Sequence, residues 1–170
     1  MWISKQTKSD VYELDEMYWF IERKERTETK ENVYVISMVS RVPRQIVGFS
    51  ASGDKSSKTI QKIVESAPIA GVYSTDGYVG YLDTDFFGGN HIRNMRDKSD
   101  THTVESVNAD IRHYIPVFRR RSRCFARKLE TLDAVLAVFI DAYNRFGEAK
   151  MKYRQRRKAG EIPFGVVDFF

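Results

Sequence analysis

Three stretches near the start of the chain have the composition of β-strands. The first covers residues 11–21 (VYELDEMYWFI), in which acids are placed among aromatic and aliphatic side chains. Two more cover residues 33–40 and 45–51, and Pro43 lies in the short turn between them. The highly charged residues 22–31 separate the first stretch from the second, as an exposed hairpin tip does. The pattern therefore predicts an antiparallel three-stranded meander.

The hydrophobic period then changes to that of a helix. A serine at position 56 or 57 can cap a segment that Pro68 stops. Its apolar residues follow helical spacing: Ile60, Ile63, Val64 and Ala67. Residues 71–75 (GVYST) come next and are typical of a short buried strand. Because a strand–helix–strand passage normally makes a parallel crossover, we expect this strand to join the sheet in parallel.

Helical periodicity returns in the C-terminal half. Residues 103–118 carry one apolar stripe, which Pro116 is expected to kink or end. The clearest helix is predicted from about residue 129 to residue 146, and residues 91–93 are expected to form a short edge strand. The order of elements predicts an α/β fold, a mixed sheet with flanking helices, in one domain that covers residues 1–170.

Composition narrows the class of protein. The 170 residues, of which 42% are hydrophobic and 13% aromatic, suffice to build the core of one domain. No apolar run approaches the roughly 20 residues of a membrane span, and the first residues have no secretory signal core. A single cysteine, Cys124, excludes an internal disulfide and a zinc cluster built on cysteines. We therefore expect a cytoplasmic globular protein with no membrane contact.

Charge is distributed unevenly along the chain. Residues 112–158 hold 14 lysines and arginines but four acids, a balance of +10, whereas the whole chain has a net charge of +5. A basic C-terminal third joined to an acidic body favours a polyanionic partner, most simply nucleic acid. The alternative is that these cations only solvate the surface of a helix.

Three carboxylates stand where a site could form. Asp15 lies inside the first predicted strand, Asp76 follows the strand 71–75, and Glu105 is in the first turn of the next predicted helix. Ligands bind at the carboxyl ends of strands in open α/β sheets, and Mg²⁺ prefers oxygen ligands. Three carboxylates on three elements are what two-metal phosphoryl chemistry needs, but 23 acids offer many such triples, so spacing alone favours ordinary surface or capping roles.

Four motifs occur in a fixed order along most of the chain. ELDE at residues 13–16 is followed by TDG at residues 75–77 and then by VExxNxxxR at residues 104–112. Arg-Arg-Ser and Phe-Ala-Arg complete the series within residues 120–127. This order resembles the catalytic part of insertion-sequence-one family transposases, and the likeness spans residues 11–146.

The resemblance implies a ribonuclease-H-like fold and a metal-dependent DNA transposase of the DDE type. Asp15, Asp76 and Glu105 would be the catalytic acids and the ligands of Mg²⁺ or Mn²⁺, with Glu13 and Glu16 as second choices. The implied activity is cleavage at a transposon end, which frees a 3′-hydroxyl, and attack of that hydroxyl on target DNA.

Residues after the third acid are the predicted DNA contacts. Asn108 and Arg112 follow Glu105 by one and two turns on the same flank of the helix, so they can touch the scissile phosphate or orient the acids. The arginine-rich connector supplies the others: Arg119, Arg120, Arg121, Arg123 and Arg127. A solvated face is the alternative for this connector.

The family's proteins carry an N-terminal zinc-binding and helix-turn-helix region, whereas here the first acid already stands at position 15. We therefore expect an upstream DNA-recognition region or partner protein, DNA as both transposon end and target, nucleoid association and a possible homo-oligomer. Two other functions stay open. One is a ribonuclease-H-like nuclease that only hydrolyses, and the other is a DNA-binding remnant without catalysis.

Overall fold

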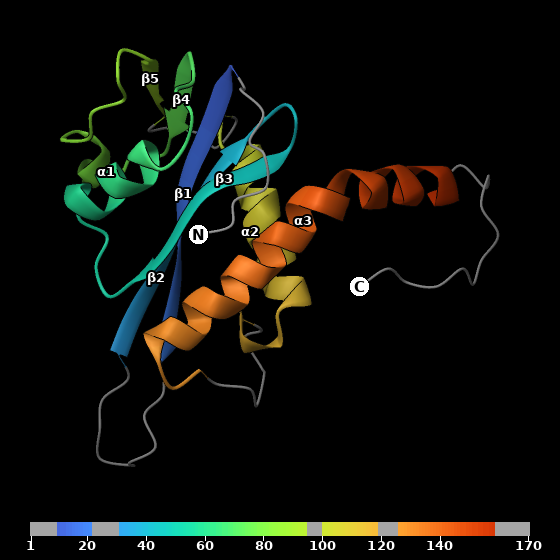
Figure 1. Cartoon of the computed structure of the whole chain (residues 1–170). Helices are drawn as coiled ribbons and strands as arrows, with labels where there is room; N and C mark the ends of the chain where they lie inside the picture. The colour runs from blue at the N-terminus through green and yellow to red at the C-terminus, as the bar shows by residue number, and fades with distance from the viewer. Residues whose placement is uncertain (1–9, 22–30, 95–99, 119–125, 159–170) are drawn as a thin grey trace.

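A computed structural model of the chain describes residues 10–21, 31–94, 100–118 and 126–158, with side chains as far as residue 147. Its centre is one five-stranded sheet (Figure 1). The strands are β1 (Val11–Ile21), β2 (Glu31–Ser40), β3 (Gln45–Ser52), β4 (Val72–Thr75) and β5 (Asn90–Arg93). They lie in the order β3-β2-β1-β4-β5.

The sheet is mixed. β2 pairs antiparallel with β1 and with β3, which confirms the predicted meander. β4 pairs in parallel with both β1 and β5, which confirms the predicted crossover and the short edge strand. The chain is therefore a mixed α/β structure with flanking helices, as the element order predicts.

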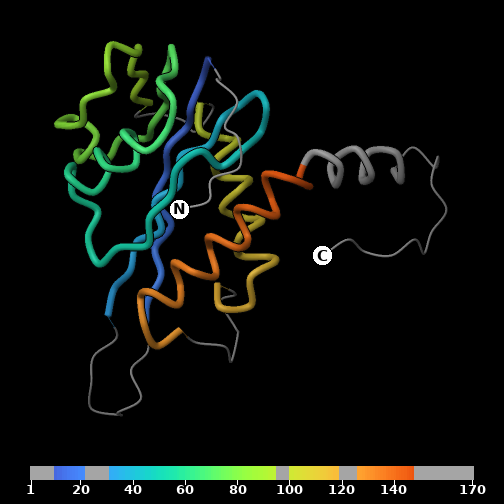
Figure 2. The backbone as a smooth tube through the Cα atoms, in the orientation of Figure 1, coloured from blue at the N-terminus to red at the C-terminus, as the bar shows by residue number. Residues whose placement is uncertain are grey.

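Helices cover the two faces of the sheet (Figure 2). On one face lies α1 (Ser57–Glu65), and on the other lie α2 (His102–Tyr114) and α3 (Leu129–Lys158). Two short 3₁₀ turns, η1 (Val79–Tyr81) and η2 (Pro116–Phe118), complete the elements in the described ranges. α2 stops before Pro116, as expected, because proline lacks the amide that a continuing helix needs. α3 runs 12 residues beyond the predicted end at residue 146.

Alternation along β1 builds two separate cores. Tyr12 and Leu14 face α1, together with Ile36, Met38 and Val47 of the neighbouring strands. Met17, Trp19 and Ile21 face α2 and α3 instead. Successive side chains of a strand point to opposite faces, so a nearly continuous apolar run fills both layers.

One buried carboxylate determines where α2 begins. Glu13 on β1 is fully buried, and its Oε2 atom accepts hydrogen bonds from the backbone amides of Thr103 at 2.7 Å and Val104 at 2.9 Å. Its Oε1 atom accepts one from Nε of Arg41 at 2.8 Å. Thr101, at the N-cap, makes no side-chain cap bond. Glu13 therefore caps the helix from the neighbouring sheet.

We expect Glu13→Ala to lower the free energy of unfolding by about 3–5 kcal/mol, because it leaves Arg41 and two helix amides without their partner. Urea denaturation followed by circular dichroism measures this change. The matched control is Glu130→Ala, since Glu130 is an exposed acid in the first turn of α3. That variant should be destabilised by about 1 kcal/mol at most. Equal destabilisation of the two variants would contradict a capping role for Glu13.

Candidate metal centre

Asp15 lies halfway along β1, on the face that α2 covers. It is partly buried, and the side-chain amide of Asn108 donates a 2.9 Å hydrogen bond to its Oδ2 atom. Asn108 belongs to α2 and is only 3% exposed. Because Glu13 fixes the start of α2, it also fixes the turn of that helix that reaches Asp15.

Asp76 follows β4 directly and comes to the same edge of β1. The parallel register pairs Val11 with Val72 and Glu13 with Ser74. Continued by two residues, this register places Asp76 beside Asp15. The Oδ1 atom of Asp76 accepts a 2.9 Å hydrogen bond from the backbone amide of Tyr78, which closes a tight turn around the carboxylate.

The turn that carries Asp76 is held from the outer strand. The side chain of Arg93 on β5 donates a hydrogen bond to the carbonyl of Gly77. His91, also on β5, shares a 2.9 Å hydrogen bond with the Thr75 hydroxyl. These contacts fix the direction in which the chain leaves the sheet, and therefore the place of the second acid.

Glu16 joins the two aspartates. One carboxylate oxygen from each of Asp15, Glu16 and Asp76 can be chosen so that all three atoms lie within 4.8 Å of one another. Asp15 and Glu16 point to opposite faces of β1, yet they meet because β4 ends at Thr75 and, among the described residues, no other strand covers this edge. Three carboxylate oxygens at this spacing suit the oxygen-rich coordination of Mg²⁺ or Mn²⁺.

Burial and mutual repulsion disfavour the ionised form of Glu16 in this acidic cluster. Burial raises the pKa of Glu16 to about 7, and the charges of Asp76 and Asp15 also raise it, while the Tyr81 hydroxyl and the Lys55 ammonium act in the opposite direction. Burial also holds the pKa of Tyr81 well above its usual range, and the Glu16 charge adds to this. Carboxylates held together in this way gain from a bound cation.

One buried polar atom next to the cluster supports the same conclusion. Oδ1 of Asn108 is buried and has no hydrogen-bond partner among the described residues, whereas the Tyr81 hydroxyl and the Glu16 carboxylate interact with each other. A buried polar atom is normally satisfied, so Oδ1 of Asn108 points to a polar ligand at this place. The residues present therefore fit a hydrated divalent cation.

The structure brings together two of the three predicted acids. Glu105 lies in the first turn of α2, partly buried and one turn before Asn108. It is not part of the acidic cluster found among the described residues, where Glu16 is the third acid instead. Glu13, the other second choice, is also outside the cluster, because its oxygens bind Arg41 and the start of α2. The role of Glu105 stays a prediction.

The predicted DNA contacts differ in their exposure to solvent. Asn108 is buried against Asp15, so the structure shows the orienting contact rather than an exposed amide. Arg112 is partly exposed on α2, and Arg127 is exposed just before α3. The other four arginines lie outside the described residues: Arg119, Arg120, Arg121 and Arg123.

Sequence patterns did not indicate Lys55 or Tyr81 as neighbours of the site. Lys55 lies in the loop before α1 and Tyr81 in η1, so both reach the cluster only through the packing of α1 and η1 against the sheet. The only feature of the sequence that links Tyr81 to the site is its position five residues after Asp76.

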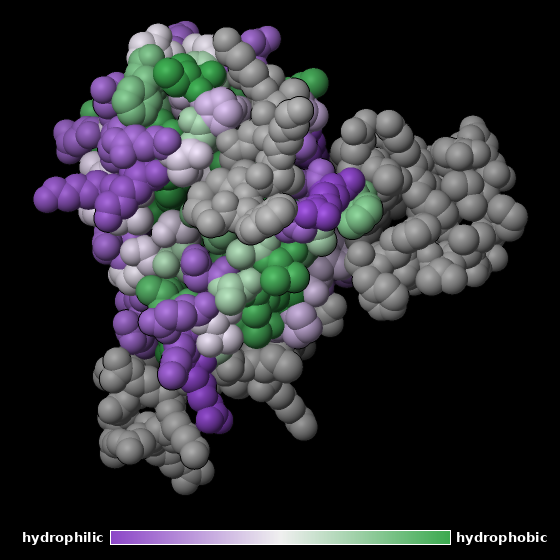
Figure 3. Space-filling view, viewed as in Figure 1, coloured by the Kyte–Doolittle hydropathy of each residue, from purple (hydrophilic) through white to green (hydrophobic). Residues whose placement is uncertain are grey.

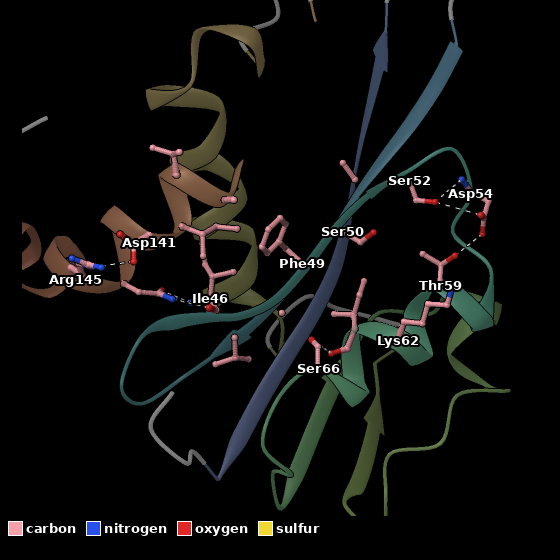
Figure 4. Close-up of a pocket in the computed structure, with 18 residues that line it drawn as sticks. Ile46, Phe49, Ser50, Ser52, Asp54, Thr59, Lys62, Ser66, Asp141 and Arg145 are labelled. Carbon is pink, nitrogen blue, oxygen red and sulfur yellow. Dashed lines mark hydrogen bonds and ion pairs between the residues drawn. The ribbon is translucent and has the colours of Figure 1, made fainter. Parts of the chain in front are cut away.

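A cavity of about 760 Å³ lies elsewhere, at the outer edge of β3 between α1 and α3 (Figure 4). Its polar lining includes the paired Asp141 and Arg145, whose charged atoms are 3.0 Å apart. Hydrophobic surface is visible over the middle of α3 in Figure 3, and Val138, which also lines the cavity, is exposed. None of the three clustered acids lines this cavity, so the cavity is separate from the acidic cluster at the β1–β4 edge.

A comparison of the chain with protein-family models found no match, and a comparison with curated proteins found none either. In the part of the chain that the structure describes, no helix combines the length and the apolar character that crossing a bilayer requires. A function is therefore inferred from the motifs and the geometry of the site.

The third ligand can be identified by metal titration. We expect Glu16→Gln to weaken Mn²⁺ binding about tenfold or more, because it removes a charged ligand, and Glu105→Gln to change it by less than about twofold. Isothermal titration calorimetry measures both. Asp83→Asn is the matched control, since Asp83 is an exposed acid shortly after η1. The opposite order of effects would make Glu105 the third ligand.

Proposed function

We propose that this chain is the catalytic domain of a DNA transposase with a ribonuclease-H-like fold. One observation carries the proposal. Asp15 on β1 and Asp76 after β4, which the motif order predicts as catalytic acids, lie in one cluster whose carboxylate oxygens are close enough to bind the same cation. The strand order, with an antiparallel β2 and parallel β4 and β5, is compatible with that fold.

The proposed chemistry uses two phosphoryl transfers. In the first, water attacks a phosphodiester at the transposon end and a 3′-hydroxyl leaves. In the second, that hydroxyl attacks a target phosphodiester, a new phosphodiester forms, and a target 3′-hydroxyl leaves. Bound Mg²⁺ or Mn²⁺ would supply Lewis acidity toward the phosphate and acidify the attacking water or hydroxyl.

The chain's own residues position this reaction. Asp15, Asp76 and Glu16 would hold the cation, with Glu105 as the rival third ligand. The amide of Asn108 fixes the Oδ2 atom of Asp15, so the carboxylate keeps one orientation as the charge at the site changes. Burial keeps the Tyr81 phenol protonated, so that it can donate a hydrogen bond toward the acids.

DNA is the proposed partner, both as transposon end and as target. Arg112 and Arg127 are accessible cations, and the arginine-rich connector between them carries the densest positive charge. The resemblance adds three further proposals: an upstream DNA-recognition region or partner protein, a homo-oligomer, and association with the nucleoid.

We expect Asp76→Asn to lower Mg²⁺-dependent cleavage at least about a hundredfold while leaving DNA affinity within about threefold, because the replaced carboxylate binds the cation rather than DNA. The assay mixes an intact duplex oligonucleotide, labelled on one strand, with supercoiled plasmid. Hydrolysis shortens the labelled strand, whereas joining transfers the label to the plasmid. Asp83→Asn again serves as the control.

Each result of this assay has a clear reading. A labelled plasmid supports strand transfer. A shortened strand without a labelled plasmid would show that the chain is a nuclease that only hydrolyses, and not a transposase. Binding without either product in the wild-type chain would leave only a DNA-binding remnant. An Asp76→Asn variant as active as the wild type would show that the metal centre is wrongly placed.

The arginine-rich connector gives a separate prediction. Changing Arg119, Arg120 and Arg121 to alanine should weaken binding to all DNA sequences alike. The slope of log affinity against log salt should fall by roughly one unit for each phosphate that these arginines neutralise in the wild-type chain. Fluorescence anisotropy at several salt concentrations measures the slope. If it does not change, these arginines only solvate the surface.

A further inference from the structure

The described elements cover only part of the sheet face beside the acidic cluster. On this face of β1, Tyr12 and Leu14 are buried beneath α1, Glu16 belongs to the acidic cluster, and Tyr18 beyond it is 54% exposed. Figure 1 shows α1 beside one end of the sheet while β1 and β2 continue past it. The uncovered part of this face therefore begins two residues along β1 from Glu16.

Two tyrosines lie side by side on this uncovered face. Tyr18 of β1 is directly opposite Tyr34 of β2, and their ring centroids are 6.0 Å apart at an interplanar angle of 65°. The Tyr18 hydroxyl donates a 2.8 Å hydrogen bond to Oδ1 of Asn32, also on β2. An exposed aromatic ring that is held by a neighbouring ring and a hydrogen bond presents a fixed surface to solvent.

A cation joins these rings to the metal centre. Nζ of Lys55 lies 3.7 Å from the ring centroid of Tyr78 and 5.5 Å from that of Tyr34. The Tyr78 hydroxyl donates a 3.2 Å hydrogen bond to the Lys55 carbonyl. Lys55 is also close enough to Glu16 for its charge to act on that carboxylate. The ammonium is therefore near both the Tyr34 ring and the acidic cluster.

We propose that Tyr18, Tyr34 and Lys55 form a platform for an unpaired DNA strand, on which a base stacks while the Lys55 ammonium contacts an adjacent phosphate next to the acidic cluster. This inference rests on the proposed function. Aromatic faces stack on bases of any sequence, and a nearby cation contacts the backbone, as in proteins that bind single strands. In a duplex the bases stack on one another, so an unpaired strand fits this surface better.

The spacing along β1 agrees with this use. Glu16 and Tyr18 are two residues apart on one face, which corresponds to about 7 Å along a strand. Successive nucleotides of a stacked strand are about 3.4 Å apart, so the base at Tyr18 would lie within roughly two nucleotides of the phosphate at the cluster. Single exposed hydrophobic residues are ordinary, but paired rings beside a cation are the parts of a surface that binds single strands.

Binding of a fluorescein-labelled 20-nucleotide oligo(dT) to the full chain, measured by anisotropy in EDTA, tests the platform. Tyr18→Ala should weaken binding about tenfold, whereas Tyr18→Phe should stay within about twofold, because phenylalanine keeps the stacking ring. Binding to a hairpin duplex should change little in either variant. Phe146→Ala is the matched control, since Phe146 is an aromatic residue, 62% exposed, on α3.

A crosslinking measurement covers the case in which an alanine variant fails to fold. Oligonucleotides that carry 5-iodouracil should crosslink on irradiation to Tyr18 or Tyr34 of the wild-type chain, as identified by peptide mass spectrometry. The platform is overturned if Tyr18→Ala affects oligo(dT) binding no more than Phe146→Ala does, or if crosslinks form only elsewhere.

The two proposals can fail separately, because the binding and crosslinking measurements need no divalent metal. Loss of oligo(dT) binding in Tyr18→Ala, together with a wild-type chain that cleaves no DNA in Mg²⁺, would keep the platform and overturn the transposase. Metal-dependent cleavage together with unchanged oligo(dT) binding in Tyr18→Ala would do the reverse.

Discussion

The arrangement of the site depends on one buried carboxylate, that of Glu13. Burying a charge costs several kcal/mol unless partners compensate it, and here two helix amides and the Arg41 guanidinium do so. Arg41 also donates to the Asp100 carbonyl at 3.2 Å, just before α2. These hydrogen bonds tie β1, the turn after β2 and the start of α2 together, and through Asn108 they determine how Asp15 is held.

The second constraint is the shortness of β4. It pairs with only the first part of β1, so the edge of β1 is uncovered from Asp15 onward in the described structure. Side chains from both faces of β1 can then reach one point, which a fully paired strand would prevent. Tyr18 is exposed for a different reason, because α1 covers only the part of this face that holds Tyr12 and Leu14.

Several features were predictable because their causes are local. The strands follow from β-rich runs and turns, and α2 stops before Pro116 because proline cannot continue a helix. Asp15 and Asp76 were predicted together with Glu105, because the motif order and the positions of these acids on the predicted elements indicated the same residues. The end of α3 was predicted too early, because the residues after 146 lose the apolar stripe while still favouring a helix.

By itself, therefore, the sequence determined the elements and their connections, since hydrophobic period and turn residues are local signals, and it indicated the candidate aspartates through the order of the motifs. Tertiary structure alone decided that Glu13 caps α2 and that Glu16 completes the cluster. It also decided that Lys55 lies near both the tyrosines and the acids. These contacts join residues far apart in the chain, and they depend on strand register and helix placement, which no local hydrophobic period specifies.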